Sequence, residues 1–339
     1  KFKEGVNLYL SKHKFANTET HDLWDALGES AGEPVQDIMN SWIFQEGHPL
    51  VKVELAADKR TVKMSQERFF YLPEAAAKLQ DKTVFQVPLL LKALTKDGIK
   101  ESRYLLNAGQ GEYKFDADVQ AVLANAGGHG FYRVLYETSL LEKLKEAMAQ
   151  SYKKKSSEDL DASTLTLNTL ERFNLVNDLW ALTVNGSVRL DEFFDFIKLA
   201  KLESDKNVWS VIVSALQYVD RVFPQDRKQV NELTKELLRP TYECLGFEEH
   251  ESDSEQVKQM RGLTIQALGT TGDDKDVQTE AAKRYEAHKA GKALLGPDVL
   301  TATVFVLASC GDAARYEEFS DAFRQAKSPQ ESDRYMYSM

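Results

Sequence analysis

The six histidines of this sequence are the side chains best suited to hold a catalytic metal ion. A zinc site of the His-Glu-x-x-His type needs two imidazoles four residues apart, because that spacing places both nitrogens on one face of a helix. No two histidines here have that spacing, and Ser254 stands where His250-Glu251 would need its second histidine. We therefore expect no metal ligand and no cofactor in this chain. The histidines are His13, His21, His48, His129, His250 and His288.

Nucleophilic and phosphate chemistry also lack a motif. The sequence contains neither the Gly-x-Ser-x-Gly elbow of serine hydrolases nor a Gly-x-x-x-x-Gly-Lys phosphate loop. Gly127-Gly128-His129-Gly130 imitates a glycine-rich cradle, but glycines commonly serve backbone geometry alone. We interpret this segment as a tight turn and expect no catalytic residue in the chain.

Several charged residues have both a functional and a structural interpretation. Two uses are open for Arg133, a two-pronged contact with a substrate carboxylate or a structural ion pair. The acidic residues between 248 and 255 lack the alternation of oxygen ligands that a calcium loop requires, so we interpret them as a solvated loop or helix start. His48 precedes Pro49 without partners for catalysis, and we expect a hydrogen-bonded structural role for it.

Composition limits the class of protein. The chain has 339 residues, and 42% of them are hydrophobic. This length exceeds that of one ordinary domain and predicts two or three folded units. Its net charge of −10 disfavours nucleic acid and anionic membranes as partners. Two cysteines are too few for a disulfide framework, and so low a number is typical of a reducing compartment. No apolar run reaches the roughly 20 residues of a membrane span. We expect a cytoplasmic protein.

Hydrophobic periodicity divides the chain into three regions. Val35, Ile38, Met39 and Trp42 recur at helical spacing before residue 47. From residue 50 to about 136, apolar and polar residues alternate, as expected for the half-buried strands of a small antiparallel sandwich. Pro88 confines its own strand to an edge or bulge position.

Beyond Tyr136 the helical period returns and persists to the end of the chain. Loop-forming residues interrupt it at intervals that suit successive antiparallel helix pairs. We therefore expect a superhelical stack of helical hairpins. The interruptions are Lys153-Lys154-Lys155-Ser156-Ser157, Asn185-Gly186, residues 269–272 and residues 295–297.

Five segments, in this order along the chain, resemble landmarks of the gluzincin zinc aminopeptidases, the family of aminopeptidase N and puromycin-sensitive aminopeptidase. The segment that contains the glycine turn is the most specific of them. The likeness covers nearly the whole chain. The segments are residues 5–10, Ile38-Met39-Asn40-Ser41-Trp42, Gln86-Val87-Pro88-Leu89, residues 125–136 and residues 172–182.

The resemblance implies a domain organisation. Residues 1–49 would be the last helices of a thermolysin-like catalytic domain, residues 50–124 an antiparallel β-sandwich, and residues 125–339 an incomplete α-helical superhelix. The landmark at the start of the helical part would be a structural junction. Its residues are Asn125, Gly127, Gly130, Tyr132, Arg133 and Tyr136.

The resemblance also implies a function for a longer protein of which this chain would be a piece. That protein would use zinc to remove amino-terminal residues from peptides, with its zinc ligands in an upstream catalytic domain. This chain would bind that domain, form a spacer, and form a wall or cap of the chamber that peptides enter. One alternative stays open, a helical-repeat interaction scaffold with no peptidase activity.

Overall fold

The computed structural model describes residues 1–153 and 164–339. These residues form two compact units, Lys1–Leu190 and Asp191–Met339. Of the predicted interruption at 153–157, only Lys153 is among the described residues, where it ends a helix. No helix in the described ranges is long and apolar enough to cross a membrane.

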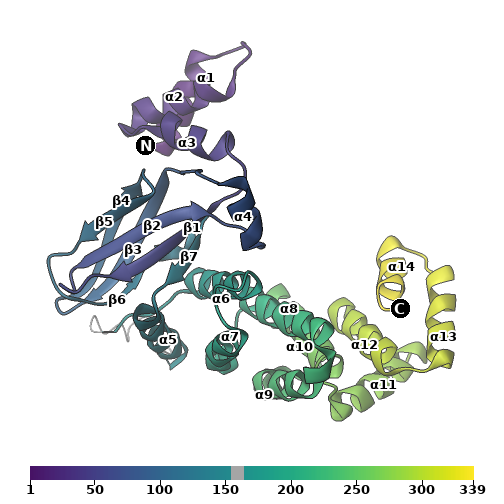
Figure 1. Ribbon diagram of the computed structural model, residues 1–339. Coiled ribbons are helices and arrows are strands. Elements are labelled where there is room, and N and C mark those ends of the chain that lie inside the picture. Colours follow the sequence, from purple (N-terminus) through teal and green to yellow (C-terminus); the bar gives the residue numbers. More distant parts are fainter. Residues whose placement is uncertain (154–163) are drawn as a thin grey trace. The chain divides into compact units, whose positions relative to one another are not determined.

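Three helices open the first unit (Figure 1). A capping box between Glu19 and Asp22 begins the second of them, and Gly32 ends it in a left-handed conformation. The first two helices pack closely, because a Cβ added at Gly5 would lie 2.7 Å from Leu27 Cδ2. Few of their residues are buried, namely Gly5, Ala26 and Leu27. The helices are α1 (Phe2–Lys12), α2 (Thr20–Ala31) and α3 (Val35–Ile43).

Two sheets follow, and the side chains between them form the core of the unit. One sheet has the strand order β5-β2-β1-β7 and the other β4-β3-β6. Alternate residues of β3 are buried, as the period-2 pattern predicts. A short helix, α4 (Pro73–Leu79), connects β2 to β3. The strands are β1 (Pro49–Leu55), β2 (Thr61–Arg68), β3 (Val87–Thr95), β4 (Gly98–Leu106), β5 (Gln110–Lys114), β6 (Val119–Leu123) and β7 (Arg133–Tyr136).

The position of Pro88 differs from the prediction, because β3 is the central strand of its sheet. Pro88 is nevertheless tolerated near the start of the strand. There β4 pairs with β3 on one side, whereas β6 pairs only from Lys92 onwards. The proline therefore removes no ladder hydrogen bond to β6.

The last strand reaches beyond the predicted end of the sandwich at residue 124. β7 pairs in parallel with β1, from Leu50 opposite Arg133 to Val53 opposite Tyr136. A single 3₁₀ turn, η1 (Ala126–Gly128), lies between β6 and β7. The predicted junction segment is thus the crossover that brings the chain from the second sheet back to the first.

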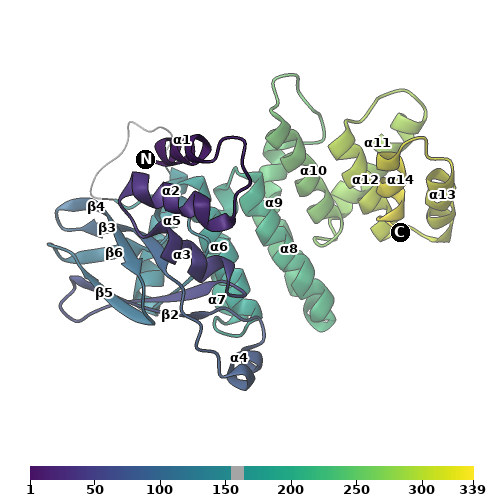
Figure 2. The ribbon, with the colours of Figure 1, turned by 90° about the horizontal axis from the view of Figure 1, so that it is seen from above.

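Two helices complete the first unit by packing on the sandwich. α5 (Thr138–Lys153) contacts β6 and β7, and α6 (Thr169–Val184) contacts β7 and η1. Both helices lie beside the sandwich in Figure 1 and Figure 2. Asn168 caps α6 by accepting a hydrogen bond from the Glu171 amide. The Glu171 carboxylate in turn accepts a hydrogen bond from the Asn168 amide, which closes a capping box.

The second unit is entirely helical in its described residues, and consecutive helices pack against one another. Together with the first unit, this arrangement confirms the predicted fold class of catalytic-domain helices, a small β-sandwich and a helical superhelix. The helices are α7 (Leu190–Ile197), η3 (Lys198–Leu202), α8 (Lys206–Val222), η4 (Pro224–Asp226), α9 (Arg227–Leu245), α10 (Glu255–Gly269), α11 (Lys275–Lys289), α12 (Pro297–Cys310), α13 (Ala313–Arg324) and α14 (Pro329–Met336).

Candidate functional site at the junction of sandwich and helices

The glycine turn of the junction is closed by the side chain of Asn125. Its Oδ1 accepts a hydrogen bond from the Gly130 amide at 2.9 Å, and its Nδ2 donates to the Gly130 carbonyl at 3.1 Å. Gly127 and Gly128 have φ angles of +74° and +77°, which L side chains rarely adopt. The interpretation of this segment as a tight turn is therefore confirmed.

Two buried tyrosines hold the backbone of Ala124 just before the turn. The Tyr132 hydroxyl donates to the Ala124 carbonyl at 2.7 Å, and the Tyr136 hydroxyl accepts from the Ala124 amide at 3.0 Å. Burial raises the pKa of both phenols, so both stay protonated. Gly130 lies against the Tyr132 ring, where a Cβ would be 2.0 Å from Cε1.

Arg133 forms the structural ion pair that was one of its two expected uses. Its guanidinium contacts Asp178 of α6 at 3.2 Å and lies over the Phe69 ring, 5.1 Å from the centroid. The other Asp178 oxygen accepts from the Val134 amide at 3.1 Å. Burial raises the pKa of Asp178 to about 7, although Arg133 and the Val134 amide favour the charged form.

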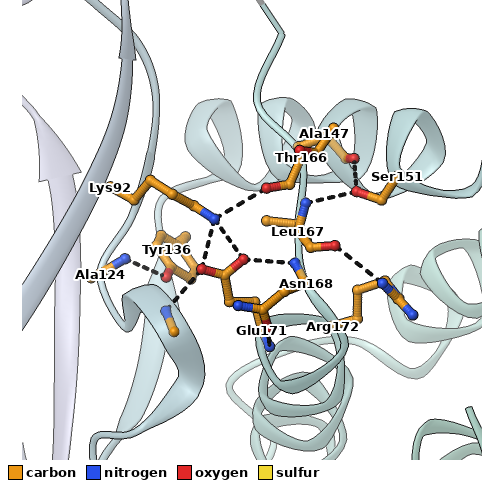
Figure 3. A network of polar contacts seen from close by, with 11 residues as sticks. Lys92, Ala124, Tyr136, Ala147, Ser151, Thr166, Leu167, Asn168, Glu171 and Arg172 are labelled. Atoms are coloured by element: carbon orange, nitrogen blue, oxygen red, sulfur yellow. Dashed lines mark hydrogen bonds and ion pairs between the residues drawn. The ribbon is translucent and has the colours of Figure 1, made fainter. Parts of the chain in front are cut away.

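A second buried ion pair joins the same helix to the other sheet (Figure 3). Lys92 Nζ of β3 lies 2.6 Å from both carboxylate oxygens of Glu171, whose side chain is 1% exposed. The Gly127 amide donates to one of these oxygens and the Asn168 amide to the other, each at 2.8 Å. Glu171 therefore connects the sandwich, the glycine turn and the start of α6.

The chain just before α6 is also tied to α5 (Figure 3). Lys92 Nζ donates to the Thr166 carbonyl at 3.1 Å. The Leu167 amide donates to Ser151 Oγ at 2.7 Å, and that hydroxyl donates to the Ala147 carbonyl at 2.6 Å. Nearly every buried polar group of this site thus has a protein partner, and the arrangement suits a rigid structural joint better than a reaction centre.

Two family descriptions match this chain. The ERAP1-like C-terminal domain matches residues 121–339, and the Peptidase family M1 domain matches residues 1–42. The chain belongs to the family of ERAP1-like C-terminal domains. It corresponds to the C-terminal portion of aminopeptidases of the M1 type, which confirms the family resemblance drawn from its landmarks.

Named relatives agree with this family. The chain is 27% identical to puromycin-sensitive aminopeptidase of Caenorhabditis elegans over 98% of its length, and 28% identical to aminopeptidase 2 of Candida albicans over 97%. It is 24% identical to aminopeptidase M1 of Arabidopsis thaliana over 100% of its length. The chain spans about a third of these curated relatives, 34% of the first two and 38% of the third.

His48 lies beside the junction of this ERAP1-like chain but has no ligand partners there. Its ring stacks on Phe69 with centroids 5.4 Å apart and contacts Phe131 at 5.6 Å. Burial and the nearby charge of Arg133 lower its pKa, so the imidazole is neutral at pH 7. Among residues 1–153 and 164–339, no three His, Cys, Asp or Glu side chains gather as metal ligands.

The acidic segment of the second unit has structural partners. Glu248 pairs with Arg284, and Asp253 pairs with the buried Arg261 at 2.8 Å. Asp253 also accepts from the His250 amide at 2.7 Å, and these contacts lower its pKa. These contacts fit the interpretation of the segment as a loop before a helix.

Three important residues of the junction were missed from sequence: Lys92, Glu171 and Asp178. A local signal existed for Glu171, because Asn168 and Glu171 have the spacing of a capping box. No local signal connects Lys92 to Glu171, since 79 residues separate them. The only sequence signal for Asp178 was its polar side chain within an apolar helical segment.

Proposed function

We propose that this chain is the non-catalytic C-terminal part of a zinc-dependent aminopeptidase that removes amino-terminal residues from peptides. One observation carries the proposal. The three N-terminal helices match the peptidase domain of family M1, and the residues from 121 onwards match the ERAP1-like C-terminal domain. Names of relatives that align with almost the whole chain agree with that activity.

The proposed role of the chain in the intact enzyme is architectural. The sandwich is a spacer, and the helices beyond it form a wall or cap of the chamber that peptides enter. The buried ion pairs of α6 support this role, because they attach this early helix of the ERAP1-like part to both sheets. Its partners are the catalytic domain of the same protein and peptide substrates, with no nucleic acid and no membrane. Zinc is held outside this chain, and the protein is cytoplasmic.

The proposed activity is tested with the intact protein and an aminoacyl reporter. We expect hydrolysis that a chelator abolishes and added zinc restores. The 339-residue chain, assayed in parallel, should release no product above background. Zinc-dependent hydrolysis by that chain alone would refute its non-catalytic role.

The proposed role as a chamber wall is tested by weakening the attachment of α6 to the sandwich and comparing substrates of different length. Glu171→Gln removes the negative charge that holds Lys92, while Glu146→Gln changes a surface pair on α5 as a matched control. If the helices form a wall of the chamber, E171Q changes the ratio of kcat/KM between a long peptide and a dipeptide reporter, and E146Q does not. If the intact protein hydrolyses neither substrate, the result favours the alternative function, an interaction scaffold with no peptidase activity.

A further inference from the structure

An apolar groove opens on the first unit where α3, β3 and the junction loop meet. Its volume is about 480 Å³, and no Asp, Glu, Lys or Arg is among its lining residues. The wall from α3 is fixed, because Trp42 Nε1 donates to the Gln86 carbonyl at 2.9 Å and its ring packs on Phe85. The groove is therefore preformed. Its most prominent lining residues are Ile38, Met39, Trp42, Pro88, Phe131 and Tyr132.

Phe131 forms an exposed aromatic rim of this groove. Its ring lies between Trp42 and His48, with centroids 6.4 Å and 5.6 Å away, yet 74% of the residue is exposed. A single exposed apolar side chain is ordinary, but an exposed aromatic rim beside an apolar groove forms a contiguous apolar surface of the kind that marks an interaction site.

The helices beside the groove indicate what covers it. α1, α2 and α3 together bury Gly5, Ala26 and Leu27, while Phe2 and Phe15 are exposed. So small a set of helices cannot supply its own core. These helices match the peptidase domain of family M1, and the chain spans only about a third of its relatives' length. Their apolar faces thus require the rest of that peptidase domain as their partner.

We propose that the groove between α3, β3 and the junction loop receives an apolar side chain from the part of the peptidase domain that lies outside this chain. The inference rests on the proposed function and adds to it a specific interdomain contact. One wall of the groove comes from the segment that matches the peptidase domain and another from the ERAP1-like segment. A side chain inserted there contacts both segments and fixes the peptidase domain against the sandwich.

The test uses the intact protein with benzoylphenylalanine in place of Phe131. This residue is mostly exposed, so the ring is tolerated without repacking the core. Illumination should link position 131 to a peptide of the peptidase domain within one molecule, as identified by mass spectrometry. Benzoylphenylalanine in place of Leu294, which is 82% exposed in the second unit, is the control and should give no link to that same peptide.

Each outcome decides the proposal. A link between two molecules shows that a second copy occupies the groove, and a link only to added substrate shows a peptide site. Absence of any link shows an open surface. Each of these three results overturns the proposal. Aminopeptidase activity is measured separately, so failure of the docking site is distinguishable from failure of the proposed function.

Discussion

The carboxylates of Glu171 and Asp178 lie seven residues apart on one face of α6, and each pairs with a cation from a different sheet. Glu171 binds Lys92 of β3, and Asp178 binds Arg133 of β7. Seven residues are two helical turns, so both carboxylates face the sandwich. One helix is thereby fixed to both layers of the sandwich, and the ERAP1-like helices begin from a rigid attachment.

The buried pair of Lys92 and Glu171 should be costly to break from one side. Glu171→Ala leaves Lys92, whose side chain is 12% exposed, without its counter-charge, and it also removes the acceptor of the Gly127 and Asn168 amides. We expect the free energy of unfolding to fall by about 3–5 kcal/mol. Urea denaturation of the purified protein, followed by circular dichroism, measures the change.

The double variant Lys92→Met, Glu171→Ala gives the control for this pair. Without an uncompensated buried charge, it should lose less than the sum of the two single variants. Glu146→Ala breaks an exposed pair with Lys143 and should cost less than about 1 kcal/mol. Equal losses in the buried and exposed single variants would contradict the structural role of the joint.

Asp178 should make stability depend on pH in an unusual direction. Its folded-state pKa of about 7 lies above the ordinary value of 3.8. Between these two values the folded protein holds the proton and the unfolded chain does not. Stability therefore falls as the pH rises through this window, by on the order of 1 kcal/mol for each pH unit.

Asp178→Asn isolates that contribution, because asparagine does not titrate and retains an oxygen for the Val134 amide. As the pH rises from about 5 to about 7, the unfolding free energy of wild type should decrease relative to that of D178N. His48 titrates in both proteins, and its lowered pKa acts in the opposite direction, so it largely cancels in the difference. A difference that stays constant over this range rules out a neutral-range pKa for Asp178.

Local features of the fold could be predicted because neighbouring residues determine them. The helical spacing of Ile38, Met39 and Trp42 identified α3, and alternation around Val51 and Val53 identified β1. The glycine turn at residues 127–130 was also identified correctly, since a positive φ restricts the residue types that fit there.

Distant partners could not be predicted from these patterns. The strand β7 was placed outside the sandwich because the family resemblance assigned residues 125–136 to the junction with the helical part, yet it pairs with β1, which lies some eighty residues earlier in the chain. Arg133 was expected to have an ion pair, but nothing near it in sequence indicated Asp178, 45 residues away. Pairing across such separations depends on the packing of the two sheets, which a single sequence does not specify.

Gly130 should be intolerant of even one added methyl group. A Cβ at this position would lie 2.0 Å from Tyr132 Cε1, so the buried ring would have to move. We expect Gly130→Ala to lower the free energy of unfolding by about 1–3 kcal/mol through overpacking. Gly109→Ala is the matched control, because no atom lies within 4 Å of its added Cβ. Comparable thermal denaturation midpoints for the two variants would show that the ring accommodates the methyl group.

The Tyr136 hydroxyl should contribute to stability through one backbone amide. It is the acceptor for the fully buried Ala124 N–H, so Tyr136→Phe leaves that donor without a partner while the ring keeps its packing. We expect a loss of about 1–3 kcal/mol, the cost of an unsatisfied buried group. Tyr316→Phe removes a half-exposed hydroxyl of the second unit and should change stability by less than about 0.5 kcal/mol. Hydrogen exchange at Ala124 gives the most direct measurement, because its amide should exchange faster in Y136F alone and not in Y316F.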